Sequence, residues 1–170
     1  MLMGMEERTH PELVVASWPM VVLVLPPALA PTWIDELDAK LDEVFARSRR
    51  YAMIIDTRPL LQVPEAAERR AIVNWLCRPS FLLNQGKWNV GSSTIVPNAA
   101  LRGALQALYW LWTPPAPQHA AGGLDEAWAW CTERLAQTNI DFPDPARSRA
   151  LADEAVTRYE ASRVPFASKL

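Results

Sequence analysis

The sequence YAMIIDTRPLLQVPEAAERRAIVNWLCRPSFLL, from Tyr51 to Leu83, indicates the fold class of this chain. Its first five residues form an unbroken apolar run that stops at Asp56, which is the pattern of a strand covered on both faces. Pro64 and Glu65 then suit the first turn of an amphipathic helix, because that turn needs no hydrogen bond from proline and its dipole favours a carboxylate. A central strand followed by such a helix predicts an α/β domain.

The segments on either side of this stretch predict the rest of a mixed sheet of four to five strands. ELVVAS and MVVLVL, the runs rich in β-branched residues before and after Trp18-Pro19, predict a hairpin or a bent strand. Residues 88–96 predict a strand weakened by Gly91 and two serines, as in strands pressed against another backbone or a ligand. Residues 118–121 predict a short fifth strand.

Helical spacing of apolar residues predicts helices packed on this sheet. Thr32 caps the first, whose acidic outer face we interpret as solvated. The helix at 98–112 is apolar on nearly every side, so we expect a core, a partner or a membrane surface around it. Ser80 to Leu83 predict only a short turn. The expected helices are a first one that Thr32 caps and that contains Ile34 to Phe45, and others at residues 64 to 75 or 76, 98–112, 124–135 and 146–162.

Length and composition predict one domain with an appendage. The chain has 170 residues, of which 50% are hydrophobic, enough for one well-filled core. We expect a flexible leader at 1–11, a domain at 12–137, and a linker, helix and tail at 138–170. The helix of that appendage either packs back on the domain or reaches a partner.

Charge and cysteine usage exclude several classes of function. A net charge of −2 gives no general attraction to nucleic acid, and no apolar run reaches the length of an integral membrane segment. Cys77 and Cys131 lack the spacing of a zinc site, which favours buried free thiols in a reducing cytoplasm. We expect neither a metal nor a cofactor.

Three short strings resemble the STAS-type fold of bacterial anti-sigma-factor antagonists, and more closely a bacterial group described as STAS-like or lipid-transfer-like. They are MIIDTR at 53–58, the segment 96–105, and LDEAWAW at 124–130. The resemblance covers roughly residues 12–136 and implies a non-catalytic regulatory module. The switching antagonists carry a phosphorylated Ser or Thr at the start of the helix after the central strand. The corresponding turn here, 61–66, has no hydroxyl, so the resemblance does not extend to that switch.

The candidate site residues each have an alternative structural role. Asp56 is either a base or a carboxylate that binds loop amides, and Arg58 with Arg102 either holds an anion or is simply solvated. A nucleophilic triad of a histidine with Ser92 or Ser93 is the remotest interpretation. The terminal Ser168-Lys169-Leu170 matches a peroxisomal address by three residues. The candidates for interaction or ligand binding are Asp56, Thr57, Arg58, Arg102, Tyr109, Trp110 and Trp112.

Two hypotheses of function follow, and an enzyme is the third and least favoured. The first is a protein-interaction module that uses the loop at 56–59 and the apolar helix at 98–112 to bind another protein or a second copy of itself. The tail helix or a second subunit would then cover Trp110 or Trp112. The second is a pocket for a small apolar ligand or lipid, lined by Trp75, Leu105, Tyr109 and Trp112.

Overall fold

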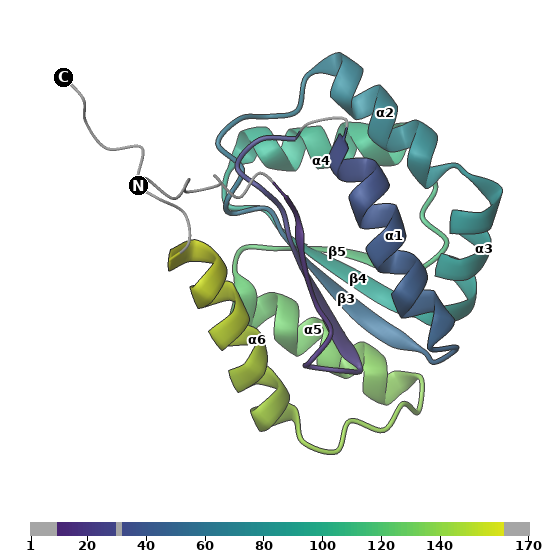
Figure 1. The fold of residues 1–170 in the computed structure, drawn as a ribbon, viewed down its shortest axis with the longest axis vertical. Helices are drawn as coiled ribbons and strands as arrows, with labels where there is room; N and C mark the ends of the chain where they lie inside the picture. The colour runs from purple at the N-terminus through teal and green to yellow at the C-terminus, as the bar shows by residue number, and fades with distance from the viewer. Residues whose placement is uncertain (1–9, 30–31, 162–170) are drawn as a thin grey trace, which may run out of the picture.

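The structure is a computed structural model that describes residues 10–29 and 32–161. Within these residues, one sheet of five strands is covered by helices on both faces (Figure 1). The predicted mixed α/β fold is confirmed. The elements run in the order β1 (Glu12–Val14), β2 (Met20–Val24), α1 (Thr32–Ala46), β3 (Tyr51–Asp56), α2 (Ala66–Leu76), α3 (Pro79–Trp88), β4 (Asn89–Ile95), α4 (Ala99–Leu111), β5 (Gln118–Ala121), α5 (Leu124–Gln137) and α6 (Pro145–Ala161).

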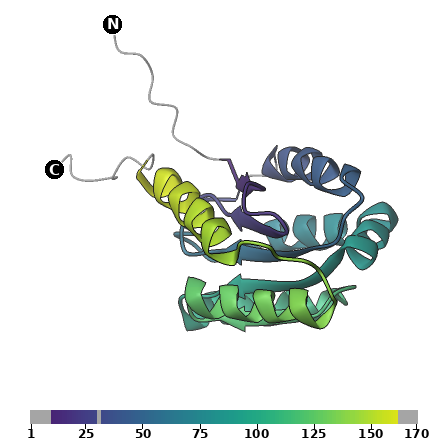
Figure 2. The ribbon, with the colours of Figure 1, turned by 90° about the horizontal axis from the view of Figure 1, so that it is seen from below.

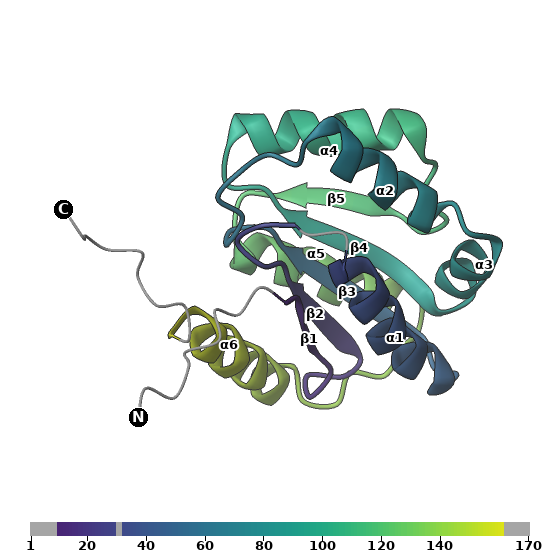
Figure 3. The same ribbon diagram turned by 45° about the horizontal axis from the view of Figure 1, so that its top comes forward.

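The strands lie in sequence order across the sheet, with β3 at its centre. β1 pairs antiparallel with β2 as a hairpin, and each later strand is parallel to the one before it. Because right-handed crossovers between parallel strands place their helices on one side, α1 to α4 all cover the same face. Helix α5 follows the last strand and crosses to the other face, where α6 also lies (Figures 2 and 3).

The alternation of side chains along β3 divides the interior into two cores. Tyr51 and Met53 point toward α1–α4, whereas Ala52 and Ile54 point toward α5 and α6. All four residues are buried, as the unbroken apolar run predicted. The central strand is therefore covered on both faces.

Helix α3 is longer than the sequence pattern indicated. The expected turn at 80–83 continues as a helix through Asn84, Gln85 and Gly86 to Trp88. A glycine inside a helix costs only about 1 kcal/mol relative to alanine. Phe81 and Gln85 are buried by this helix, so packing outweighs the local breaker signal.

Close packing of α5 explains why β4 has a glycine at position 91. A Cβ atom built on Gly91 would lie 2.9 Å from Cη2 of Trp130 and 3.2 Å from Cγ of Arg134, both on α5. The strand is pressed against a neighbour, but that neighbour is the indole ring of Trp130 and not the backbone or ligand that the sequence predicted. Gly91 therefore allows α5 to pack closely on the sheet.

Helix α6 packs back on the domain, which is one of the two alternatives considered for the tail. Its Ala152, Val156 and Tyr159 are buried in the core that α5 shares with the sheet. The Tyr159 hydroxyl donates to the carbonyl of His10 at 3.1 Å, and Arg149 donates to Asp125 of α5 at 2.8 Å. The proposed leader, apart from its last two residues, and the terminal Ser168-Lys169-Leu170 lie outside the described residues. Across residues 10–29 and 32–161, no helix is both long enough and apolar enough to cross a membrane.

Candidate ligand-binding site

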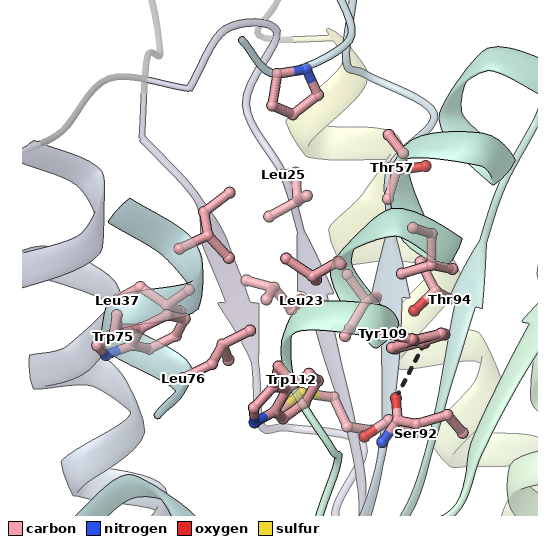
Figure 4. Close-up of a pocket in the computed structure, with 18 of the residues that line it drawn as sticks. Leu23, Leu25, Leu37, Thr57, Trp75, Leu76, Ser92, Thr94, Tyr109 and Trp112 are labelled. Carbon is pink, nitrogen blue, oxygen red and sulfur yellow. Dashed lines mark hydrogen bonds between the residues drawn. The ribbon is translucent and has the colours of Figure 1, made fainter. Parts of the chain in front are cut away.

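A cavity of about 190 Å³ lies between the sheet and helices α1, α2 and α4 (Figure 4). Its walls are almost wholly apolar. An apolar cavity of ~150 Å³ is already large enough to stay dry and bind benzene. The space under these helices is therefore large enough for a small organic molecule.

The floor of the cavity has an apolar half and a polar half. Strand register places Met53 beside Ser92 and Ile55 beside Thr94, and it pairs Ser92 with Gln118 of β5. Side chains over β2 and β3 are apolar, whereas those over β4 and β5 carry hydroxyl and amide groups. In Figure 4 the hydroxyl-bearing Ser92 and Thr94 lie on the opposite side of the cavity from Leu37 and Trp75.

Helices α1, α2 and α4 form most of the roof, and Phe81 and Gln85 of α3 also line the cavity. Trp75 of α2 packs against Trp33 of α1 and Phe81 of α3, with ring centroids 6.3 Å and 4.7 Å apart. Its Nε1 donates to Asp38 Oδ1 at 2.8 Å, so the acidic face of α1 contributes one carboxylate to the positioning of α2. Helix α4 closes the remaining side. The α4 segment contributes Leu101, Ala104, Leu105, Leu108, Tyr109 and Trp112 to the lining.

Tyr109 is the ionisable residue of the polar half. Its hydroxyl donates to Gln118 Oε1 at 3.4 Å, a long distance for such a bond, while Gln118 Nε2 donates to the carbonyl of Ala116 at 3.0 Å. Burial raises the pKa of Tyr109, and a hydrogen bond with Thr94 opposes that shift. The phenol therefore stays protonated at neutral pH and can donate.

Ser92 is oriented by an amide beside the cavity. Asn89 Nδ2 donates to Ser92 Oγ at 2.7 Å and to Gln85 Oε1 at 2.7 Å, while Asn89 Oδ1 accepts from the amide of Gly91 at 2.9 Å. Because Ser92 accepts this bond, its own proton is available to another acceptor. The indole Nε1 of Trp112 is also buried, without an acceptor among the described residues.

The carboxyl ends of the strands form the other end of the cavity. Thr57 lines it, and its hydroxyl donates to the carbonyl of Ile95. Arg69 also lines the cavity and donates through Nη1 to the carbonyl of Pro64 in the loop that follows β3. Among the described lining residues, Arg69 alone carries a charge at neutral pH.

Asp56 and Arg58 lie apart from this cavity. Asp56 is 1% exposed, and Arg58 binds it with Nε to Oδ1 at 2.9 Å and Nη2 to Oδ2 at 2.7 Å. The hydrogen bond with Asp56 raises the pKa of Arg58. The guanidinium is already engaged by this carboxylate, so the arrangement gives no support to the idea of Arg58 and Arg102 holding an anion together.

The candidates on α4 separate into two environments. Tyr109 and Trp112 line the cavity, whereas Trp110 is 88% exposed and Arg102 is exposed in the first turn of the helix. Helix α6 packs on the other face of the sheet, so it does not cover Trp110. Of the two alternatives for covering Trp110, the tail helix is therefore excluded and a second subunit is left.

Ser93, His119 and Glu126 lie in line on the α5 side of the sheet. Ser93 Oγ is 3.1 Å from His119 Nδ1, and His119 Nε2 is 3.6 Å from Glu126 Oε1. The imidazole stacks on Trp130 with ring centroids 5.2 Å apart. Ser93 has no exposed surface, so a substrate cannot reach this hydroxyl and the group is structural.

Sequence reasoning named part of the lining, including Thr57 and Tyr109, and missed the polar residues of β4 and β5 as ligand contacts. Trp75, Leu105, Tyr109 and Trp112 were proposed as one pocket, and all four line the cavity. Ser92, Thr94 and Gln118 were not proposed as ligand contacts. The alternation of Ser92 and Thr94 in a strand was the available signal, because residues two apart share a face.

No known relative helps to interpret this arrangement: no family model, curated protein or solved structure matches the chain. Within the described chain, no group of three or more His, Cys, Asp or Glu side chains gathers as a metal site requires. Both cysteines are free thiols, but the prediction that both are buried was wrong, since Cys77 at the end of α2 is exposed while Cys131 is buried.

Proposed function

We propose that this chain is a non-catalytic binding module that holds a small apolar ligand or lipid between its sheet and helices α1, α2 and α4. The observation that carries the proposal is the apolar cavity that Trp75, Leu105, Tyr109 and Trp112 line together. Ligand sites in proteins are concave, mostly apolar and equipped with a few polar groups. This cavity has each of those properties.

The energetics of packing support an occupant. The apolar side chains that line this space lack neighbours across it, and a ligand that filled it would supply the missing contacts. The aromatic roof is held by contacts of its own, including the Trp75 bond to Asp38, so the cavity does not depend on the ligand for its shape.

The chemistry of the lining favours binding over catalysis. Tyr109 and Arg69 are the titratable side chains among the described lining residues, and Tyr109 stays protonated at neutral pH. No carboxylate, histidine or cysteine in that set could act as a base or nucleophile. The chain resembles STAS-like proteins but lacks the hydroxyl of their phosphorylation switch. This resemblance is consistent with a regulatory role in a bacterial cytoplasm.

Filling the cavity tests this function. N-phenyl-1-naphthylamine, a neutral apolar fluorophore, should bind the native protein with an increase in emission. Ala104→Trp places a large ring in the cavity and should abolish that binding. Ala100→Trp changes an exposed position one turn earlier on the same helix and should leave it unchanged. Native mass spectrometry of freshly purified protein should also reveal a co-purified small apolar mass.

These measurements have a clear negative result. A fluorophore that fails to bind the wild-type protein, together with a ligand-free native mass, would rule out the binding module. Equal binding by the two tryptophan variants would place the fluorophore elsewhere on the molecule.

A second candidate function is protein interaction through α4. Trp110 is 88% exposed and its neighbour Leu111 is 65% exposed, which is unusual for large apolar side chains on one helix end. The partner in this proposal is another protein or a second copy of the chain, which would form a homodimer. The two functions are compatible, because the inner face of α4 lines the cavity while Trp110 faces solvent.

A further inference from the structure

We infer that the cavity selects a ligand with an apolar chain and one uncharged hydroxyl head, such as a medium-chain alcohol. This inference rests on the proposed binding function and adds the class of ligand. The head would bind the polar half of the cavity, which consists of Ser92, Thr94 and Gln118 in the floor and Tyr109 in the roof. The chain would lie over β2 and β3 under α1 and α2.

Strand register gathers the polar groups at one place. Ser92 pairs with Gln118 and Thr94 with Ala120, so the two hydroxyls and the amide lie on neighbouring strands of the same face. Tyr109 reaches them from α4, since its hydroxyl lies 3.4 Å from Gln118 Oε1. Side chains from two strands and one helix therefore converge on a single region of an otherwise apolar cavity (Figure 4).

The hydrogen-bonding capacity of this region matches a hydroxyl. Ser92 already accepts from Asn89, so its proton can be given to a ligand oxygen. The hydrogen bond from Tyr109 to Gln118 Oε1 is long, at 3.4 Å, and therefore weak. Gln118 Oε1 can accept a stronger bond from a ligand hydroxyl. The region thus offers both donors and an acceptor, and a hydroxyl group uses both.

Charge argues against an anionic head. None of the four residues is ionised at neutral pH, and burying a carboxylate without a partner is costly. Arg69 is the charged lining residue, and its guanidinium donates to Pro64 in the loop after β3. Ser92, which pairs with Gln118, is instead four residues before Val96, and Val96 follows the carboxyl end of β4. A fatty-acid anion would have to place its head toward Arg69, away from the polar half.

A matched set of competitors tests the head group. Displacement of N-phenyl-1-naphthylamine would be measured at pH 8 with 1-decanol, with undecane, which has the same number of heavy atoms, and with decanoate. We expect 1-decanol to bind at least ~10-fold more tightly than decanoate, since one buried unpaired charge costs more than one hydrogen bond gains.

Deletions of single polar groups then locate the head. Ser92→Ala removes the proposed donor and Gln118→Met removes the proposed acceptor, so each should weaken 1-decanol by about threefold to tenfold and leave undecane unchanged. Tyr159→Phe, a matched deletion on the α6 side of the sheet, should affect neither ligand. Using two independent deletions keeps the test valid if one variant folds poorly.

The failures of the two proposals are distinguishable. If decanoate binds as tightly as 1-decanol and Arg69→Met weakens decanoate alone, the cavity is an anion-headed lipid site and the hydroxyl inference is overturned while the binding function stands. Equal affinities for 1-decanol and undecane would also overturn it. If the fluorophore does not bind and no competitor stabilises the protein against heat, the binding function itself fails.

Discussion

The lack of a side chain at one residue of β4 determines how closely α5 approaches the sheet. Gly91 of β4 leaves room for the ring of Trp130, and that ring also stacks on His119 of β5. Arg134, one turn further along α5, donates to the carbonyl of Val90 through Nε at 3.2 Å. Glycine is therefore required at this position by packing and not by backbone conformation.

Gly91→Ala should lower the free energy of unfolding by about 1 to 3 kcal/mol, because the added methyl group would overlap Trp130 and Arg134. Gly103→Ala is the matched control. A Cβ there meets open space in the exposed part of α4, so alanine should raise stability by about 0.5 to 1 kcal/mol. Urea denaturation of both variants measures the effect. Equal changes of the same sign would contradict the role assigned to Gly91.

Burial of Cys131 should make the stability depend on pH in alkaline solution. Burial raises the pKa of this thiol to about 12, from 9.0 in the unfolded chain. Its contribution is fully present below pH 9 and is lost as the pH rises toward 12, since only the unfolded thiol ionises in that interval. Between pH 8 and 10.5, the free energy of unfolding should therefore fall by about 1 to 2 kcal/mol less in Cys131→Ala than in the wild type. Identical pH profiles in urea denaturation would show that Cys131 is not responsible.

At the scale of the elements, the structure differs from the sequence pattern where tertiary packing overrides local signals. The strands, the central position of β3 and the buried face of α5 follow from apolar periodicity. Helix α3 was underestimated because Asn84 and Gly86 predict a break that the burial of Phe81 outweighs. The four aromatic and leucine lining residues could be named from α2 and α4, whereas Gln118 could not, since its contact with Tyr109 depends on the placement of α4 over β5.

Helix α6 should contribute measurably to stability. Val156 is 5% exposed in the core shared with α5, so Val156→Ala should cost about 2 kcal/mol by loss of buried methyl groups. Val63→Ala removes the same groups from a side chain that is 39% exposed and should change stability by less than about 0.5 kcal/mol. Urea denaturation compares the two. A neutral Val156→Ala would indicate that α6 detaches readily from the domain.

At the scale of the whole molecule, the two sides of α4 connect the two proposed functions. Its inner side chains line the cavity, and its outer end presents Trp110 and Leu111 to solvent. The two tryptophans at this end of the helix are separated by it, since Trp112 lines the cavity and Trp110 does not. A partner bound to the outer end of α4 would therefore contact the helix that also contacts the ligand.

Trp110→Asp tests association through that surface. If α4 mediates a homodimer, wild-type protein should show concentration-dependent mass in analytical ultracentrifugation, and the variant should remain a monomer because a carboxylate replaces the apolar contact. The circular dichroism spectrum should not change, since a side chain that is 88% exposed contributes little to the fold. Leu83→Asp, at a residue of α3 that is 71% exposed, is the control and should leave the association intact. If both variants and the wild type sediment as the same species, α4 does not join two copies, and its exposed end is left as a surface for a different protein.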